Sequence, residues 1–223
     1  MTDHPEGRAH DAFLQPRSVA IIGASDDPGR VGGMPLRFLR EVGFPGAVYP
    51  VNPRRELVQG ERAFPDISAV PEPVDLAIIA VPSEDVMKAV EDCATHGVRA
   101  AVVFSAGFSE TDAAGEQRQR ELADVVARTG IRLCGPNCAG LMSTRARLTA
   151  SFGSHLAADA SIPIGSISVV SQSGAVGAYL FTLARQRGIG LNHWVTTGNE
   201  VDMTVADFVE LIADDPDTEV IAL

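Results

Sequence analysis

The chain has 223 residues, which is long enough for one large α/β domain or two small ones. Of these residues 45% are hydrophobic and 21% are charged, which is an ordinary composition for a globular protein. Its formal net charge of −11 argues against non-specific binding to nucleic acid or to an anionic membrane, because the field of the protein repels polyanions. No apolar run approaches the roughly 18 residues of a membrane span, and the N-terminal residues lack the apolar core of a signal peptide.

The three cysteines, Cys93, Cys134 and Cys138, are odd in number and form no C-x-x-C pair. This spacing predicts reduced thiols rather than disulfides, and no metal site. We therefore expect a cytoplasmic protein.

The first predicted strand covers residues 18–22 and ends at Gly23, where a small polar loop leads into a helix predicted over residues 31–42. A strand, loop and helix in this order present backbone N–H groups and a helix N-terminus to a phosphate. Gly23, Gly29 and Gly32 follow the spacing G-x5-G-x2-G, which differs from the G-x-G-x-x-G of dinucleotide-binding loops.

The second predicted strand, residues 47–51, runs into Asn52, Pro53, Arg54 and Arg55. An NAD site has an acidic residue at this point, which binds the hydroxyls of the ribose. Two guanidinium groups suit a phosphate better than a diol. The residues indicate a nucleotide with a phosphate on its ribose, which is coenzyme A or NADP.

Further strands are predicted at residues 74–81, 100–104 and 131–133, with helices at 83–96, capped by Ser83, and at 113–128. Apolar strands that alternate with helices predict a parallel sheet covered on both faces. The strands end in small residues, prolines or amides, at 23–25, 52–54, 81–82, 105–107 and 135–138. Each segment alone is typical of a simple turn. Together they favour a ligand cleft, because ligands bind at the carboxyl edge of such sheets.

Residues 143–163 are small, polar and weakly periodic, and we interpret them as a link between two domains, residues 1–145 and 146–223. Strands at 167–170, 192–196 and 219–223 alternate with helices at 175–187 and 204–213. A sheet of three strands with an unprotected last strand is not a finished domain. We expect this sheet to need a partner domain or an oligomer.

Ser171, Gln172, Ser173 and Gly174 join the first strand of this second part to its helix. The free N–H groups and the positive dipole end of the helix make an anion site. Residue 171 is not glycine, so the G-x-S-x-G elbow of hydrolases is poorly supported. A serine that only caps the helix is the alternative.

The order of several segments resembles NDP-forming acyl-CoA synthetases, the group of ADP-forming acetate–CoA ligases related to the α subunit of succinyl-CoA synthetase. The resemblance covers roughly residues 13–223 and rests on GASDDPGRVGGMPLRFLREVGFPGAVYPVNPRR, PEPVDLAIIAVP, AAVVFSAGFSE, GIRLCGPNCAG, SVVSQSGAVG and TTGNEVDMTVADFVELIADDPDTEVIAL. It implies an α/β fold with a Rossmann-like, parallel-sheet CoA-binding domain followed by part of a flavodoxin-like domain. It also implies that an acid, CoA and ATP give acyl-CoA, ADP and phosphate through acyl phosphate and phosphohistidine intermediates.

The resemblance also implies roles for individual residues. The CoA phosphates contact Gly23, Ala24, Ser25, Arg30, Val31 and Gly32. The nucleotide end contacts Asn52, Pro53 and Arg54, with Arg55 beside them. The adenine and pantetheine lie along Val81, Pro82, Ser105, Ala106 and Gly107. Asn137 and Cys138 lie near the thiol, with Cys138 as a packing residue rather than a nucleophile. The helix after Ser171, Gln172, Ser173 and Gly174 holds the phosphohistidine and the phosphoryl group.

No histidine in the chain matches the phosphohistidine of the family, which lies in a late glycine-rich segment; the five are His4, His10, His96, His155 and His193. We therefore expect no catalytic residue in this chain. ATP and Mg would bind through an ATP-grasp domain or subunit, and the second substrate would be a small carboxylic acid. Two alternatives stay open: a CoA- or acyl-CoA-sensing module of a protein acetyltransferase, and an NADP-dependent oxidoreductase, which the glycine spacing and Pro82 disfavour.

Overall fold

The computed structural model describes residues 12–153, 156 and 163–223. The first half of the chain forms a five-stranded sheet in the order β2-β1-β5-β6-β7, and all of its strand pairs are parallel. The strands are β1 (Ser18–Ile22), β2 (Ala47–Val51), β5 (Leu76–Ile79), β6 (Ala100–Val103) and β7 (Arg132–Cys134). The predicted parallel α/β sheet is confirmed. His4, His10 and His155 lie outside the described residues.

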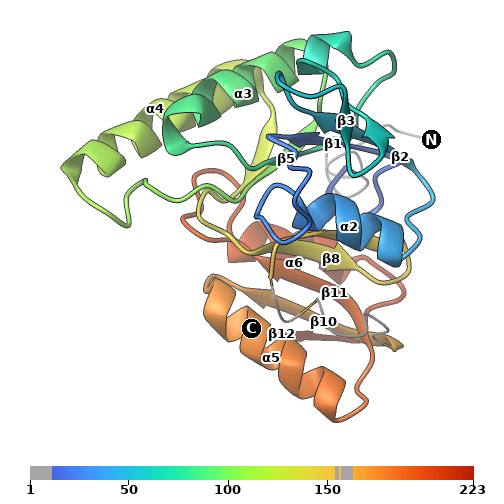
Figure 1. The fold of residues 1–223 in the computed structure, drawn as a ribbon. Helices are drawn as coiled ribbons and strands as arrows, with labels where there is room; N and C mark the ends of the chain where they lie inside the picture. Colours follow the sequence, from blue (N-terminus) through green and yellow to red (C-terminus); the bar gives the residue numbers. More distant parts are fainter. Residues whose placement is uncertain (1–11, 154–155, 157–162) are drawn as a thin grey trace, which may run out of the picture.

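Both faces of this sheet are covered by helices, as Figure 1 shows. The helices are α2 (Met34–Glu41), α3 (Ser83–Thr95) and α4 (Ala113–Thr129). Alternate residues of β5 serve the two faces: Ile78 joins the cluster that contains α2, and Ile79 joins the cluster that contains α3 and α4. Burial of both faces explains why the strands are continuous apolar runs.

The structure corrects the predicted start of α2 and the predicted cap of α3. Helix α2 begins at Met34 rather than at residue 31, because Arg30 and Gly33 first close a turn in which the Gly33 N–H donates to the Arg30 carbonyl at 2.8 Å. Ser83 does not cap α3: Pro82 holds the N-cap position, and Ser83 is the first helical residue. Sequence alone places such boundaries only to within about two to four residues.

A short hairpin after β2 was not predicted. It consists of β3 (Leu57–Val58) and β4 (Glu61–Arg62), joined by Gln59 and Gly60 and followed by a turn of 3-10 helix at Ile67–Ala69. Strands of two residues are too short to show an alternation of apolar and polar side chains.

The second sheet has five strands in the order β12-β10-β11-β8-β9. Its parallel part is β10 (Ile164–Ser171), β11 (Leu191–Thr196) and β12 (Val220–Ala222), next to helices α5 (Gly174–Gln186) and α6 (Val205–Ala213). The antiparallel hairpin β8 (Gly140–Ser143) and β9 (Leu148–Ser151) pairs with β11.

This hairpin corrects two predictions. Residues 143–163 are not simply a link, and the sheet does not stop at three strands, because β8 and β9 extend it on the far side of β11. The hairpin was missed because its serines and threonines are buried on both faces and give no polar alternation. The domain boundary at residues 145 and 146 falls between its two strands and stays a prediction.

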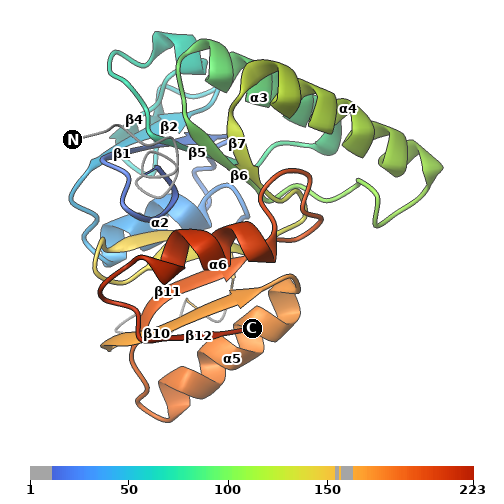
Figure 2. The same cartoon turned by 180° about the vertical axis from the view of Figure 1, so that it is seen from behind.

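The two sheets share one hydrophobic core. Helices α2 and α6 lie between them, whereas α5 covers the outer face of the second sheet (Figures 1 and 2). Leu39 of α2, Leu148 of β9 and Phe208 of α6 belong to the same buried cluster, and the Phe13 and Phe208 rings meet edge to face at 5.3 Å. The two domains therefore pack as one body. No helix in the described part of the chain is long and apolar enough to cross a membrane.

Candidate functional site

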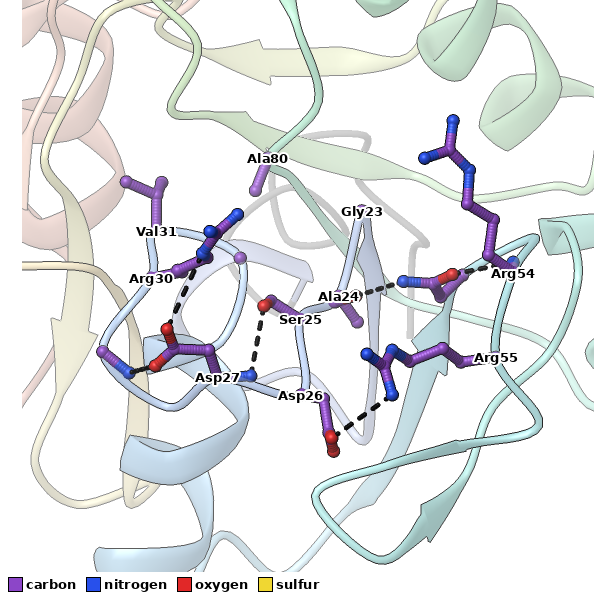
Figure 3. Close-up of a pocket in the computed structure, with 13 residues that line it drawn as sticks. Gly23, Ala24, Ser25, Asp26, Asp27, Arg30, Val31, Arg54, Arg55 and Ala80 are labelled. Carbon is purple, nitrogen blue, oxygen red and sulfur yellow. Dashed lines mark hydrogen bonds and ion pairs between the residues drawn. The ribbon is translucent and has the colours of Figure 1, made fainter.

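A large cleft of about 1030 Å³ lies at the carboxyl ends of β1, β2 and β5 (Figure 3). β1 has β2 on one side and β5 on the other, so the chain reverses direction across the sheet at this point. Open α/β sheets bind ligands at such a crevice. The cleft is lined by Gly23, Ala24, Ser25, Asp26, Asp27, Gly29, Arg30, Val31, Gly32, Asn52, Arg54, Arg55 and Ala80.

The loop after β1 is closed tightly on itself. The Ser25 N–H donates to the Gly32 carbonyl at 3.1 Å, and a Cβ on Gly32 would lie 2.2 Å from the Gly23 carbonyl oxygen. Only glycine permits this approach of the two ends of the loop. The N–H groups of Val31 and Gly32 have no hydrogen-bond partner within the described residues. Two adjacent free donors that line a cleft are suited to an anion.

The cleft is lined by three arginines and two aspartates, so one arginine has no acidic partner in the cleft. Arg55 pairs with Asp26 at 3.4 Å and Arg30 pairs with Asp27 at 3.6 Å, so these two arginines are neutralised locally. Arg54 forms no ion pair with any described residue, and its guanidinium carries no dashed line in Figure 3.

Asn52 positions the segment that carries this cation. Its side-chain Nδ2 donates to the Ala24 carbonyl at 2.8 Å, and its Oδ1 accepts from the Arg54 N–H at 2.8 Å. The amide thus joins the end of β2 to the loop after β1. As a result, the base of Arg54 is held at a defined place beside the loop after β1.

A second cleft of about 350 Å³ lies at the N-terminus of α5. The Ser173 hydroxyl accepts from the Val176 N–H at 3.3 Å, so Ser173 is the N-cap of this helix. The Gln172 side chain donates to the Gly198 carbonyl at 2.6 Å. The positive end of the α5 dipole lies at this cleft, so the small cleft is also suited to an anion. Its lining residues are Asn137, Cys138, Ala139, Phe152, Gln172, Ser173, Gly174, Ala175 and Gly198. Ser171 is buried and does not line this cleft.

Six of the predicted residues lie outside both clefts. Pro53, Val81, Pro82, Ser105, Ala106 and Gly107 line neither cleft. The Ser105 hydroxyl donates to the Val81 carbonyl at 2.5 Å, and the Ser105 carbonyl accepts from the Asn137 N–H at 3.0 Å. Hydrogen bonds therefore link Val81, the residue after Ala80 of the large cleft, through Ser105 to Asn137 of the small cleft.

A carboxylate holds the loop after β6 in place. Glu110 accepts hydrogen bonds from the N–H groups of Gly107 and Phe108 and from the Asn199 side chain of the second domain. Burial raises the pKa of Glu110, but these hydrogen bonds outweigh that effect and leave the pKa below its ordinary value. Glu110 is therefore a carboxylate at neutral pH and links the two domains.

The cysteines belong to the protein interior. All three are buried and free. The hydrogen bond with Cys138 and burial raise the pKa of Cys134, and burial raises the pKa of Cys93 to about 12. Thiols that stay protonated are poor nucleophiles. The Cys138 thiol donates to the Val103 carbonyl at 3.4 Å, which supports the packing role expected from the sequence.

Asp26, Asp27 and Ala80 line the large cleft and were not predicted. Acidic residues do not by themselves suggest an anion site. Their signal in the sequence was the run of two aspartates, proline and glycine, which is typical of a tight turn. The structure shows that Asp27 makes such a turn, because its carboxylate accepts from the Gly29 N–H at 2.9 Å.

Residues 17–144, which contain the whole of this large cleft, match the family described as the CoA binding domain. The chain belongs to the CoA-binding domain family. Residues 164–223, which follow the CoA-binding domain, match the family described as the succinyl-CoA ligase-like flavodoxin domain. The resemblance inferred from the sequence and the predicted fold class are thereby confirmed.

The relatives of this CoA-binding chain are longer proteins. It is 38% identical over 213 residues to the α subunit of ADP-forming acetate–CoA ligase II of Pyrococcus furiosus, covering 96% of this chain and 45% of that one. It is 40% identical to ADP-forming acetate–CoA ligase I of Archaeoglobus fulgidus, covering 96% and 30%. A solved structure of dinucleotide-forming acetyl-coenzyme A synthetase 1 from Candidatus Korarchaeum cryptofilum, in complex with phosphate and ADP, superposes with a TM-score of 0.87 at 36% identity and covers 95% and 44%. The chain thus spans less than half the length of these relatives.

Proposed function

We propose that the chain is the CoA-binding part of an ADP-forming acyl-CoA synthetase. In this reaction an acid, CoA and ATP give acyl-CoA, ADP and phosphate through acyl phosphate and phosphohistidine intermediates. The observation that carries the proposal is the large cleft, which combines the free N–H groups of Val31 and Gly32 with the unpaired guanidinium of Arg54. The names of the relatives, which are ADP-forming ligases, support the same reaction.

Coenzyme A carries a pyrophosphate and a ribose 3′-phosphate, and the cleft has one group suited to each. The loop that includes Val31 and Gly32 binds the pyrophosphate through backbone N–H groups. Arg54 binds the 3′-phosphate by a charge-assisted hydrogen bond. The pantetheine arm then follows the edge formed by Val81 and Ser105, so that the thiol reaches Asn137 at the second cleft.

The second cleft would receive the phosphoryl group. The free N-terminus of α5, with Ser173 and Gly174 at its start, favours an anion through its dipole. The related synthetase solved with phosphate and ADP is in keeping with phosphoryl transfer in such proteins. The thiol end of CoA and the phosphoryl site would thus be neighbours.

The remaining parts of the reaction belong to partners. We assign ATP and Mg²⁺ to an ATP-grasp domain or subunit, the acyl group to a small carboxylic acid, and the assembled enzyme to an oligomer. The length of the relatives, more than twice that of this chain in each case reported above, supports the need for such parts. The three buried free thiols support a reducing compartment, the cytoplasm.

Calorimetric titration of the purified chain with CoA, dephospho-CoA and NADPH tests this function. We expect CoA to bind more tightly than dephospho-CoA, which lacks the 3′-phosphate, and more tightly than NADPH. NADPH binding without a CoA signal would contradict the synthetase function and favour an NADP-dependent oxidoreductase. Absence of heat with all three ligands would contradict a CoA site in this chain.

A further inference from the structure

Gln59 has a backbone conformation that needs an explanation. It lies with Gly60 in the two-residue turn of the β3–β4 hairpin, and their φ angles are +50° and +84°. Positive φ at both positions is usual in such turns, but the first position normally carries asparagine, aspartate or glycine. Glutamine in this region of φ is strained. A strained residue of this kind is retained where its side chain makes contacts that the usual turn residues cannot make.

The side chain of Gln59 spans the two ends of the loop after β1. Its Nε2 donates to the Ser25 carbonyl at 3.0 Å and to the Gly33 carbonyl at 2.9 Å. Both N–H bonds of the amide are used in this way. Ser25 and Gly33 enclose the segment that contributes Val31 and Gly32 to the cleft.

The main chain of Gln59 is tied to the same structure. Its N–H donates to the Asp26 Oδ1 at 2.7 Å, and its carbonyl accepts from the Arg40 guanidinium of α2 at 2.8 Å. The residue thus joins the hairpin to the loop and to the helix that follows the loop. Gln59 itself does not line the cleft.

These contacts bear on the anion site because carbonyl dipoles repel an anion and N–H dipoles attract one. Two acceptors of the loop, on Ser25 and Gly33, are bound to the amide of Gln59, and a third, on Ala24, is bound to Asn52. Acceptors that are held by side-chain donors cannot turn toward the ligand. The donors on Val31 and Gly32 then need little rearrangement when an anion arrives.

We propose that Gln59 is a positioning residue of the CoA site, which holds the two ends of the phosphate loop through one carboxamide while touching no ligand itself. The inference rests on the proposed function, since it concerns the loop assigned to the CoA pyrophosphate. CoA and dephospho-CoA share that pyrophosphate. Loss of Gln59 therefore weakens both ligands equally, whereas loss of a contact to the 3′-phosphate weakens only CoA.

The test compares Gln59→Asn and Gln59→Glu with the unmodified chain. Asparagine favours positive φ and keeps the amide, but it is one methylene too short to reach both carbonyls. Glutamate has the length of glutamine but replaces the donor with an oxygen that faces the Ser25 and Gly33 carbonyls. Gln117→Asn is the matched control, because Gln117 lies on α4 and donates only to Glu121, at 2.9 Å.

We expect Gln59→Asn to weaken both CoA and dephospho-CoA about tenfold by calorimetry, with the ratio of the two affinities and the melting temperature unchanged. Gln59→Glu weakens both further, and Gln117→Asn weakens neither. In the ligand-free protein, Gln59→Asn speeds amide hydrogen exchange in residues 23–34 relative to the control. Equal binding by the wild type and both Gln59 variants would overturn this inference alone. No CoA binding by the wild type would overturn it together with the proposed function.

Discussion

Glu110 and Asn199 connect the two domains through their side chains. The Glu110 carboxylate accepts from the Asn199 Nδ2, which also donates to Gln119 at 2.9 Å, and the Asn199 Oδ1 accepts from Asn137 at 3.2 Å. The same carboxylate holds the Gly107 N–H of the loop after β6. A change in the second domain at Asn199 therefore reaches the segment that we assign to the pantetheine arm of CoA.

Asn199→Asp places a carboxylate beside that of Glu110 and removes the donor. We expect a loss of about 0.5–1 kcal/mol in the free energy of unfolding at pH 7, because the pair is partly screened by solvent. The loss should shrink as the pH is lowered through the pKa values of the two carboxyl groups, since protonation of either group ends the repulsion. Thermal unfolding at pH 7 and pH 4 measures this. Asn199→Ser, which adds no charge, serves as the control and should show no such pH dependence; an equal loss for both variants would exclude repulsion.

Arg54→Ala should weaken CoA by roughly 1.5–3 kcal/mol and leave dephospho-CoA nearly unchanged, since only CoA has the 3′-phosphate. Arg55→Ala is the matched comparison. Arg55 is already paired with Asp26, so its loss should affect CoA less. Calorimetry on both variants with both ligands decides the matter. If Arg54→Ala weakens the two ligands equally, Arg54 does not bind the 3′-phosphate.

Gly32→Ala should lower CoA affinity by at least about tenfold, because its Cβ would lie 2.2 Å from the Gly23 carbonyl oxygen and would force the loop open. Gly29→Ala in the same loop is the control. There the added Cβ would meet only the Asp27 carboxylate, at 3.3 Å, which can move aside. A similar affinity for the two variants would show that the close approach at Gly32 does not matter for binding.

Asp75→Asn should remove an acid-sensitive contribution to stability. Asp75 is nearly buried and accepts from the Arg17 N–H at 2.9 Å and from the Arg99 guanidinium at 2.5 Å. Burial raises the pKa of Asp75, but these bonds and the charges of Arg17 and Arg99 outweigh it and leave the pKa below the ordinary value of 3.8.

The unfolded chain thus binds the proton more readily, so the stabilisation is complete above pH 3.8 and is lost as the pH falls through the lowered pKa. We expect Asp75→Asn to cost about 2 kcal/mol at pH 7 and progressively less as the pH falls below 3.8. Urea unfolding at several pH values measures the difference between the two proteins. A cost that does not change with pH would contradict the assignment.

The sequence predicted the parallel strands well because each is buried on both faces. Val19, Ile78 and Val102 are fully buried, and runs of such residues are hard to mistake. Asn52 and Arg54 were also predicted as site residues. An NAD site has an acidic residue after the second strand, which binds the ribose, whereas this chain has an amide and two arginines there. Asn52 and Arg54 both line the large cleft.

Gln59 and the β8–β9 hairpin could not be predicted in this way. Gln59 acts through contacts with residues 26 and 34 positions away in the sequence, Gly33 and Ser25, and its neighbours form strands of only two residues. Thr149 and Ser151 of the hairpin are buried polar residues, which look like loop residues until their partners are known. In both cases the information lies in tertiary contacts and not in local composition.

Helix α2 limits how the CoA-binding domain can be exchanged between proteins. Its Leu36 and Leu39 pack in one core with Val19 of the first sheet and with Leu148 and Ala150 of the hairpin. A segment that ended after β7 would carry the nucleotide loop but would leave the far side of α2 in water. An engineered graft, or a natural recombination event, has to transfer the hairpin together with the loop or supply another apolar surface in its place.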